Sequence, residues 1–130
     1  MKTDDFDWSV HGGGTPSTGT GPSSDHTLQN SKGLYAYIET SAPRRRGQKA
    51  QLLSASQAPT GISGKCFKFW YHMYGRTVGT LNVYVSKNVS SSNLLWTLSG
   101  NQGNQWKPAQ LSVTSTQSFN VSCEILICQI

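Results

Sequence analysis

The stretch Cys66-Phe-Lys-Phe-Trp-Tyr-His-Met-Tyr74 alternates between side chains that favour a protein interior and side chains that favour water. Phe67 and every second residue up to Met73 are apolar or aromatic, so an extended chain would place them on one face. The intervening residues form the opposite face and include a lysine and a histidine. This period of two predicts a half-buried β-strand.

The same alternation recurs on both sides of this stretch. Glu occurs only twice and Ala six times in 130 residues, so good helix formers are scarce. Seven short strands separated by turn residues favour an all-β protein, a two-sheet antiparallel, jelly-roll-like β-sandwich in which each sheet covers the other's apolar face. The expected strands are residues 33–39, 49–54, 66–74, 81–85, 93–98, 109–113 and 119–127.

Residues 9–31 lack this alternation and are rich in glycine, proline and hydroxyl side chains. A structureless loop of this length is uncommon inside a compact domain and is usually functional or pinned by something. We therefore expect residues 9–31 to form a long loop, in which Asp25 is the charged residue.

The net charge of +5 reflects 11 Lys and Arg against six acids, but only one basic cluster is dense. Arg44, Arg45, Arg46 and Lys49 fall in one short stretch. Nucleic-acid binders usually spread cations over a face and interleave stacking aromatics, so we expect no nucleic-acid partner. The cluster predicts a solvated turn, with contact to an acidic glycan or phospholipid as the second option.

The sequence shows no membrane-spanning or targeting pattern. Its longest unbroken apolar run, from Ile125 to Cys128, is far too short to cross a bilayer. The first residues, Met1-Lys2-Thr3, lead directly into two aspartates rather than an apolar segment. We expect neither a signal peptide nor a transmembrane segment in this chain.

Several segments, in order along the chain, resemble the MAM domain, a module named after meprin, neuropilin and the mu-type receptor tyrosine phosphatase. The opening Asp4-Asp5-Phe6-Asp7-Trp8 and residues 66–75 are the most recognisable, and residues 14–17, 20–22, 25–27, 79–85 and 100–103 follow the same pattern. The resemblance implies a jelly-roll-like sandwich and extracellular or cell-surface recognition of another protein, or of the same module on a neighbouring molecule. MAM domains are not themselves catalytic, so the resemblance implies no enzyme activity and no required cofactor.

Two departures from the family pattern lie at the ends. MAM domains begin with a strand that carries two cysteines, and this chain has only Met1-Lys2-Thr3 there. Residues 125–130 do not resemble the family's closing strand. We therefore expect a partial MAM domain at residues 1–124, incomplete at both termini, and a divergent tail at residues 125–130. A non-functional fragment from a truncated gene model is the alternative.

Three cysteines leave the disulfide pattern open. In the family, the cysteine that matches Cys66 pairs with a closing cysteine that this chain lacks, so Cys123 or Cys128 could take its place. The alternative is that all three are reduced, buried side chains that pack as small hydrophobes.

Asp4, Asp5 and Asp25 are the candidate metal ligands. Calcium takes several oxygen ligands, and a loop rich in carboxylates and carbonyls can be pinned by one ion. The resemblance allows a structural calcium near the opening segment. The alternative is that Asp7 and Asp25 cap turns through the local backbone.

Two further groups of residues suggest contact with sugars. Asn88 and Asn120 each begin an Asn-Val-Ser sequence, the acceptor pattern for an N-linked glycan in a secreted protein. Trp70, Trp96 and Trp106 could form a sugar-stacking platform, which makes a carbohydrate-binding sandwich the alternative function. Large aromatics in a small sandwich belong more often to the core.

An enzymatic interpretation finds little support. His11, His26 and His72 could join an aspartate in a hydrolytic site, but catalysis requires a nucleophile, a base and an orienting group in contact. The sequence contains no nucleophile-elbow, zinc-binding or phosphate-loop motif. We predict a non-catalytic recognition or adhesion module of a larger cell-surface or secreted protein, with a protein partner or homophilic contact and a glycan as a further ligand.

Overall fold

The computed structural model describes residues 4–88 and 91–128, and these residues form eight β-strands that pair only in antiparallel fashion. The predicted all-β, antiparallel fold is confirmed. The strands are β1 (Ser9–Gly12), β2 (Leu34–Tyr37), β3 (Lys49–Leu53), β4 (Lys65–Tyr71), β5 (Thr80–Asn88), β6 (Ser91–Ser99), β7 (Lys107–Val113) and β8 (Asn120–Leu126).

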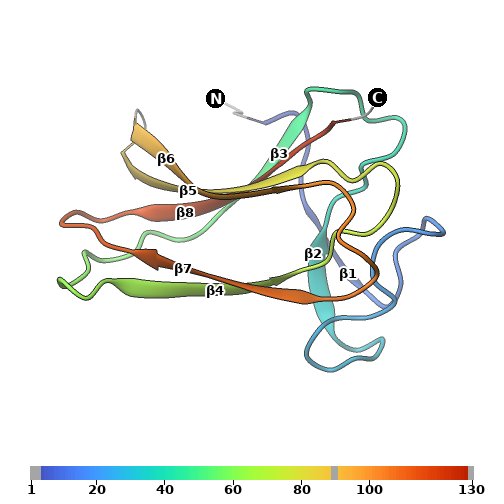
Figure 1. The fold of residues 1–130 in the computed structure, drawn as a ribbon, viewed down its shortest axis with the longest axis horizontal. Helices are drawn as coiled ribbons and strands as arrows, with labels where there is room; N and C mark the ends of the chain where they lie inside the picture. Colours follow the sequence, from blue (N-terminus) through green and yellow to red (C-terminus); the bar gives the residue numbers. More distant parts are fainter. Residues whose placement is uncertain (1–3, 89–90, 129–130) are drawn as a thin grey trace.

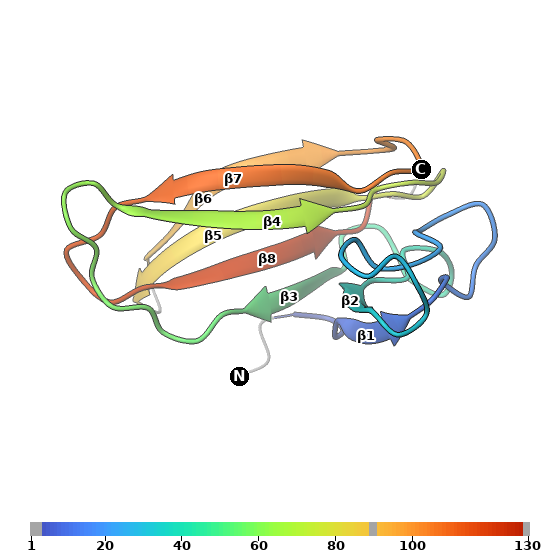
Figure 2. The ribbon, with the colours of Figure 1, turned by 90° about the horizontal axis from the view of Figure 1, so that it is seen from below.

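Two sheets face each other as the layers of a sandwich (Figure 1). One sheet has the strand order β3-β8-β5-β6 and the other pairs β4 with β7. In the view from below, β4 and β7 lie across the larger sheet, while β3 lies to one side of them (Figure 2). The smaller sheet therefore covers only part of the larger one.

The alternation along β4 sorts its side chains as the sequence predicts. Phe67 and Phe69 are half-buried and pack against the core, whereas Lys68 and Trp70 on the other face are exposed. The opposing strands contribute small, branched side chains, and Val83 of β5 is completely buried. These apolar contacts between the sheets supply most of the stabilising burial.

A row of polar side chains crosses the outer face of the larger sheet. Gln51, Glu124, Asn82 and Thr97 are cross-strand partners on β3, β8, β5 and β6. Gln51 Nε2 donates to Glu124 Oε2 at 3.1 Å, and Thr97 Oγ1 donates to Asn82 Oδ1 at 2.7 Å. Glu124 and Asn82 are buried, so these bonds satisfy groups that would otherwise be costly to desolvate.

The expectation of one unbroken loop over residues 9–31 was wrong at its beginning. Ser9–Gly12 forms β1, which pairs with β2 from Ser9–Tyr37 to Gly12–Leu34 as a third, two-stranded sheet. The four residues of β1 have no buried face of their own, so no alternation marks them in the sequence. Pairing with a strand more than twenty residues away produces this element.

The residues set apart as a tail contribute to the core as far as the structure describes them. β8 continues through Leu126 and pairs with both β3 and β5, and Ile125 and Ile127 are buried. The Ile127 amide donates to the Gln48 carbonyl at 2.9 Å, so the pairing extends beyond the strand. Residues 125–127 thus belong to the packed sandwich.

Candidate functional site

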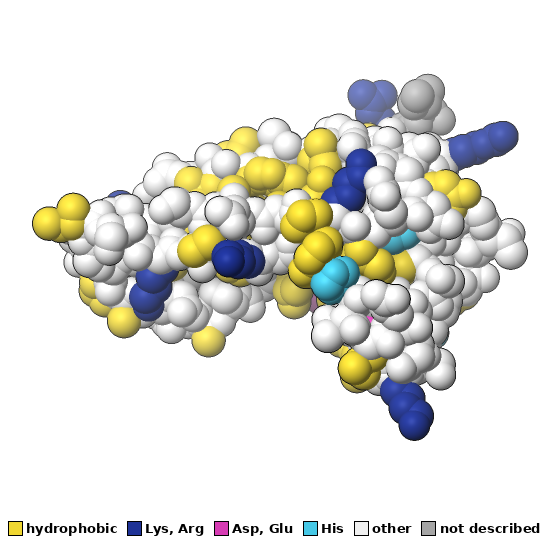
Figure 3. All heavy atoms as spheres, turned by 60° about the horizontal axis from the view of Figure 1, so that its bottom comes forward, with side chains coloured by type: hydrophobic (Ala, Val, Ile, Leu, Met, Phe, Trp, Pro, Cys, Tyr) yellow, Lys and Arg dark blue, Asp and Glu magenta, His cyan; other side chains and the backbone are white. Residues whose placement is uncertain are grey.

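A cleft of about 490 Å³ opens between the two sheets beside β2. Most of the side chains that line it are aromatic or aliphatic, and three large ones that are substantially exposed reach it from β2, β3 and β4. These are Leu34, Leu52 and Trp70, which are 68%, 45% and 47% exposed. Figure 3 shows hydrophobic side chains gathered around a histidine near the middle of one face.

The long loop between β1 and β2 is pinned against this cleft by aromatic side chains. The His26 ring stacks on the Trp70 ring with their centroids 3.6 Å apart and their planes 17° apart. The Trp106 indole Nε1 donates to the Ser24 carbonyl at 2.9 Å, and Thr20 Oγ1 donates to the Tyr74 carbonyl at 2.6 Å. The loop is therefore held by a side chain of β4, by the backbone of the segment after β4 and by a side chain of the segment before β7.

Asp25 caps a turn at the centre of this loop. Its Oδ2 accepts hydrogen bonds from the Leu28 and Thr27 amides at 2.7 and 2.9 Å. The Leu28 bond, opposed by desolvation and reinforced by neighbouring amides, lowers the pKa of Asp25 below its usual value. A Cβ at Gly33 would collide with this carboxyl group, so only glycine fits beside it. Turn capping is thus the role that the structure gives Asp25.

The other two candidate metal ligands hold the N-terminal segment on β3. Asp5 Oδ2 accepts from the Lys49 amide at 2.8 Å, and Asp4 Oδ2 accepts from the Gln51 amide at 3.2 Å. Over residues 4–88 and 91–128, no three His, Cys, Asp or Glu side chains are grouped to hold a metal ion. The structure thus does not bring Asp4, Asp5 and Asp25 together as a calcium site.

The three histidines form their hydrogen bonds with groups other than carboxylates. His11 Nε2 lies 2.7 Å from the Gly14 carbonyl, and His72 Nε2 lies 3.0 Å from Asn104 Oδ1. His26 contacts the neighbouring Thr27 hydroxyl at 3.5 Å. These contacts do not supply the base and carboxylate pair that the hydrolase hypothesis requires.

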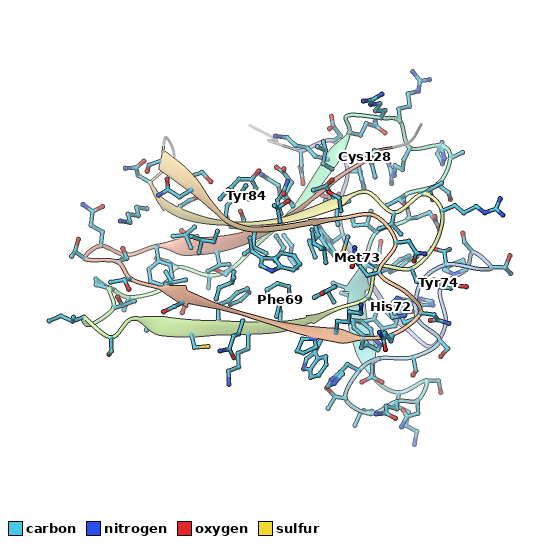
Figure 4. All side chains as sticks on the ribbon, in the orientation of Figure 1. Phe69, His72, Met73, Tyr74, Tyr84 and Cys128 are labelled. Atoms are coloured by element: carbon cyan, nitrogen blue, oxygen red, sulfur yellow. The ribbon has the colours of Figure 1, made fainter. Side chains whose placement is uncertain are left out.

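His72 is a titratable group of the cleft that is partly shielded from solvent. In the described part of the chain its Nδ1 is buried without a hydrogen-bond partner. Desolvation, opposed by the bond to Asn104, lowers the pKa of His72 below 6.5. Figure 4 shows His72 and Tyr74 where β4 gives way to the following loop, while Phe69 points between the sheets.

Acidification is expected to destabilise the fold through His72. Between its lowered folded pKa and the ordinary value of 6.5, the unfolded chain binds more protons. The contribution of His72 to the free energy of unfolding is therefore complete above pH 6.5 and is lost as the pH falls through the lowered pKa of the folded state. The melting temperature measured between about pH 7.5 and 5.5 should fall more for the wild type than for His72→Gln.

Two features isolate this effect. Asp25 and Glu39 have lowered pKa values, so their contributions disappear only below 3.8 and 4.5, at more acidic pH. A His11→Gln variant should keep the wild-type slope because His72 remains in place. An equal slope in His72→Gln and the wild type would show that His72 is not responsible.

The profile described as MAM domain, meprin/A5/mu, matches residues 1–129 of this chain. The chain belongs to the MAM domain family. MAM domain-containing glycosylphosphatidylinositol anchor protein 2 of Mus musculus is 42% identical in an alignment of 135 positions that covers 94% of this chain. Neuropilin-1a of Danio rerio is 34% identical over 94% of the chain, and thyroid hormone-induced protein B of Xenopus laevis 40% over 90%.

This MAM domain corresponds to a small part of each of those relatives. It spans 14%, 13% and 17% of the lengths of the mouse, zebrafish and frog proteins. The family match crosses the boundary drawn at residue 124 and includes most of the expected tail. Within the described ranges, the structure has no helix that is long and apolar enough to cross a membrane.

The three cysteines of the MAM domain are free thiols at separate positions. Cys66 is exposed on β4 opposite Ser112, and Cys128 is exposed after β8, with its Sγ 3.3 Å from Thr80 Oγ1. Cys123 lines the cleft, and burial raises the pKa of its thiol, which favours the protonated form. No disulfide joins any two of these cysteines in this structure, and of the three only Cys123 packs as an interior side chain.

The two predicted glycan acceptors differ in their surroundings. Asn88 is exposed at the end of β5, and the remainder of its motif, Val89 and Ser90, lies outside the described residues. Asn120 Nδ2 donates to the Ser54 carbonyl at 3.0 Å, and Ser122 of the same motif is buried. Glycosylation remains a prediction, and Asn88 is the better candidate of the two because its side chain is exposed in the folded domain.

The sequence left part of this site unpredicted. The alternation along β4 places Trp70 on the same face as polar side chains, and this position was the feature of the sequence that could have predicted its exposed ring. Trp96 instead packs edge-on against Phe69 between the sheets, with ring centroids 5.3 Å apart. Nothing in the local pattern indicated that His26 would stack on Trp70 or that Leu34 would reach the same cleft.

Proposed function

We propose that this MAM domain is a non-catalytic recognition module that binds a protein partner through the cleft beside the long loop. The observation that carries the proposal is the exposure of Leu34 and Trp70 at one cleft. Apolar side chains that gather around a concave surface are characteristic of interaction sites. Tryptophan in particular often contributes much of the binding energy in protein interfaces.

The cleft is better suited to recognition than to chemistry. His26 is occupied by stacking on Trp70, and His72 is bonded to a neutral amide. Neither contact activates a nucleophile or places a proton acceptor beside one. Binding through complementary shape and burial of apolar surface requires no such group.

The family relationship supports a role outside the cell. The name of the mouse relative describes a glycosylphosphatidylinositol anchor protein that contains a MAM domain. We infer that this domain acts at the cell surface or in the extracellular space as one module of a longer protein. Its partner is then another surface protein or the same module on a neighbouring molecule.

Removing the exposed anchors should abolish most of this binding. A multivalent form of the domain is added to cultured cells, and Trp70→Ser combined with Leu34→Ser is expected to bind at least about tenfold more weakly. The control combines Leu94→Ser with Leu95→Ser, which are 51% and 40% exposed on β6 outside the cleft. Sedimentation of the isolated domain and its variants detects homophilic contact through the same surface.

Treatment of the cells separates protein recognition from the second candidate function. Binding should be lost after the cells are treated with trypsin and retained after their N-linked and O-linked glycans are removed enzymatically. Retention after trypsin with loss after glycan removal would favour carbohydrate binding, which the exposed ring of Trp70 in a cleft also supports. Equal binding by the cleft variant and the control would exclude the cleft as the site.

A further inference from the structure

One end of the sandwich carries three exposed arginines. Arg45 and Arg46 lie in the loop of residues 40–48, and Arg76 lies in the loop of residues 72–79. Both loops are at the end of the molecule where β1 and β2 lie, the end opposite the turns that join β3 to β4 and β7 to β8 (Figure 1). The arginines therefore share one end although they are thirty residues apart in the sequence.

Direct contacts hold the two loops beside each other. Thr40 Oγ1 and Thr77 Oγ1 are 3.3 Å apart and share a hydrogen bond. The Gly47 amide donates to the Ile127 carbonyl at 2.9 Å, and Gly79 packs so closely on the Leu126 carbonyl that a Cβ would collide with it. Both loops thus rest on adjacent residues, Leu126 and Ile127, where β8 ends.

The first arginine of the basic stretch anchors the loop, and this leaves the next two free to reach a ligand. The Arg44 guanidinium lies over the Phe6 ring, 4.0 Å from its centroid, in a cation–π contact. Phe6 is buried, so this contact ties the loop to the core. Arg45 and Arg46 then extend from an anchored base into solvent.

No carboxylate in the described part of the chain forms an ion pair with these three arginines; the ion pair found there joins Lys49 to Glu124 at 3.7 Å. Glu39 precedes the loop, but Ser17 Oγ and Ser41 Oγ donate to its two oxygens at 2.7 and 2.6 Å. Its carboxylate is therefore engaged by hydroxyl groups. The positive charge at this end remains available to a ligand.

We propose that this end of the domain is a binding site for a sulfated polysaccharide. A guanidinium group binds a sulfate with two parallel hydrogen bonds, and three such groups on adjacent loops suit a chain that carries repeated sulfates. None of the large exposed hydrophobic side chains of the described residues falls within 40–48 or 72–79. Protein interfaces and membrane surfaces usually require such apolar anchors, so the features favour a polyanionic sugar.

The test removes the three arginines and compares the loss with an equal loss of charge elsewhere. The variant is Arg45→Gln, Arg46→Gln, Arg76→Gln, and binding to immobilised heparin is measured at several salt concentrations. Its affinity should fall at least about tenfold, which is what the loss of a single charge-assisted hydrogen bond can cause. The wild-type affinity should decrease with added salt, since salt screens exposed charges.

A matched control removes three lysines that lie away from this end. The 72–79 loop joins the end of β4 to the start of β5. Lys65 begins β4 and Lys87 lies near the end of β5, so both are at the end of their strand that is remote from this loop. Lys68 is exposed on the outer face of β4. Lys65→Gln, Lys68→Gln, Lys87→Gln has the same net charge as the arginine variant. It should retain heparin binding to within about threefold, because only remote, screened charge is lost. Circular dichroism melts establish that both triple variants are folded.

Four results would overturn the proposal. The first is an equal loss of binding in the two triple variants, since net charge would then suffice. The second is wild-type binding to unsulfated hyaluronan as tight as to heparin. The third is unchanged heparin binding by the arginine variant. The fourth is an arginine variant that binds heparin like the wild type but no longer binds phosphatidylserine vesicles, which would indicate that the arginines contact a membrane surface. The Trp70→Ser, Leu34→Ser variant should bind heparin normally, so this site and the cleft can fail independently.

Discussion

Replacement of Phe119 by alanine is expected to lower the free energy of unfolding by about 3–5 kcal/mol. Phe119 is only 2% exposed and packs in a cluster with Val83, Val85, Val113 and Val121 between the two sheets. Alanine would leave a cavity there in addition to the lost apolar burial. Urea denaturation followed by tryptophan fluorescence measures the change as a lower midpoint with an unchanged slope.

A conservative variant at the same position separates packing from backbone effects. Phe119 and Gln57 exchange two backbone hydrogen bonds of 2.7 and 3.0 Å, which a side-chain substitution leaves in place. Phe119→Leu retains most of the apolar volume and should cost less than about 1.5 kcal/mol. Equal stability of Phe119→Ala and the wild type would mean that this cluster is not a packed core.

Ile127→Ala is expected to destabilise the domain by about 2–5 kcal/mol. Ile127 is 1% exposed and packs with Phe6, Ala50, Met73 and Ile125 in the second core cluster. The residue lies in the segment that the sequence led us to expect as a divergent tail, so the variant measures how far that segment contributes to the fold. The midpoint of urea unfolding gives the change.

The same substitution at an exposed position is the control. Ile62 is fully exposed, at 102%, in the loop between β3 and β4. Ile62→Ala removes the same atoms without opening a cavity and should change stability by no more than about 0.5 kcal/mol. Similar effects of the two substitutions would show that residues after β8 do not pack as the structure indicates.

Most strands were predictable because their signal is local. In β4 the alternation of Phe67, Phe69 and Tyr71 with Lys68 and Trp70 specifies both the strand and the side chains that turn inward. A side-chain period of two follows directly from extended backbone geometry. The pattern therefore needs no knowledge of the partner strand.

The pairing of strands was not predictable in the same way. None of the four residues of β1 is buried, and the strand exists because β2 supplies its hydrogen bonds, so its residues carry no period. In the order β3-β8-β5-β6, β8 pairs with β3 and β5, which are distant from it in the chain. Strand order depends on how sheets cover one another, which no short window of sequence records.

The candidate sites illustrate the same division. The sequence drew attention to Asp4, Asp5 and Asp25 by residue type, but the structure assigns the first two to amides of β3 and the third to its own turn. It marked Trp70 as an aromatic of uncertain role, and the structure exposes its ring beside His26. Residue chemistry indicates what a side chain can do, whereas its neighbours determine what it does.

By itself, the sequence determined the all-β class, seven of the eight strands, the inward face of β4 and the membership in the MAM family that the comparisons established. These properties depend on residue spacing and on the order of segments along the chain. Only the tertiary structure decided which loops meet at the cleft and which arginines share one end. Such contacts join residues far apart in sequence, and their free energy appears only once the sheets have packed.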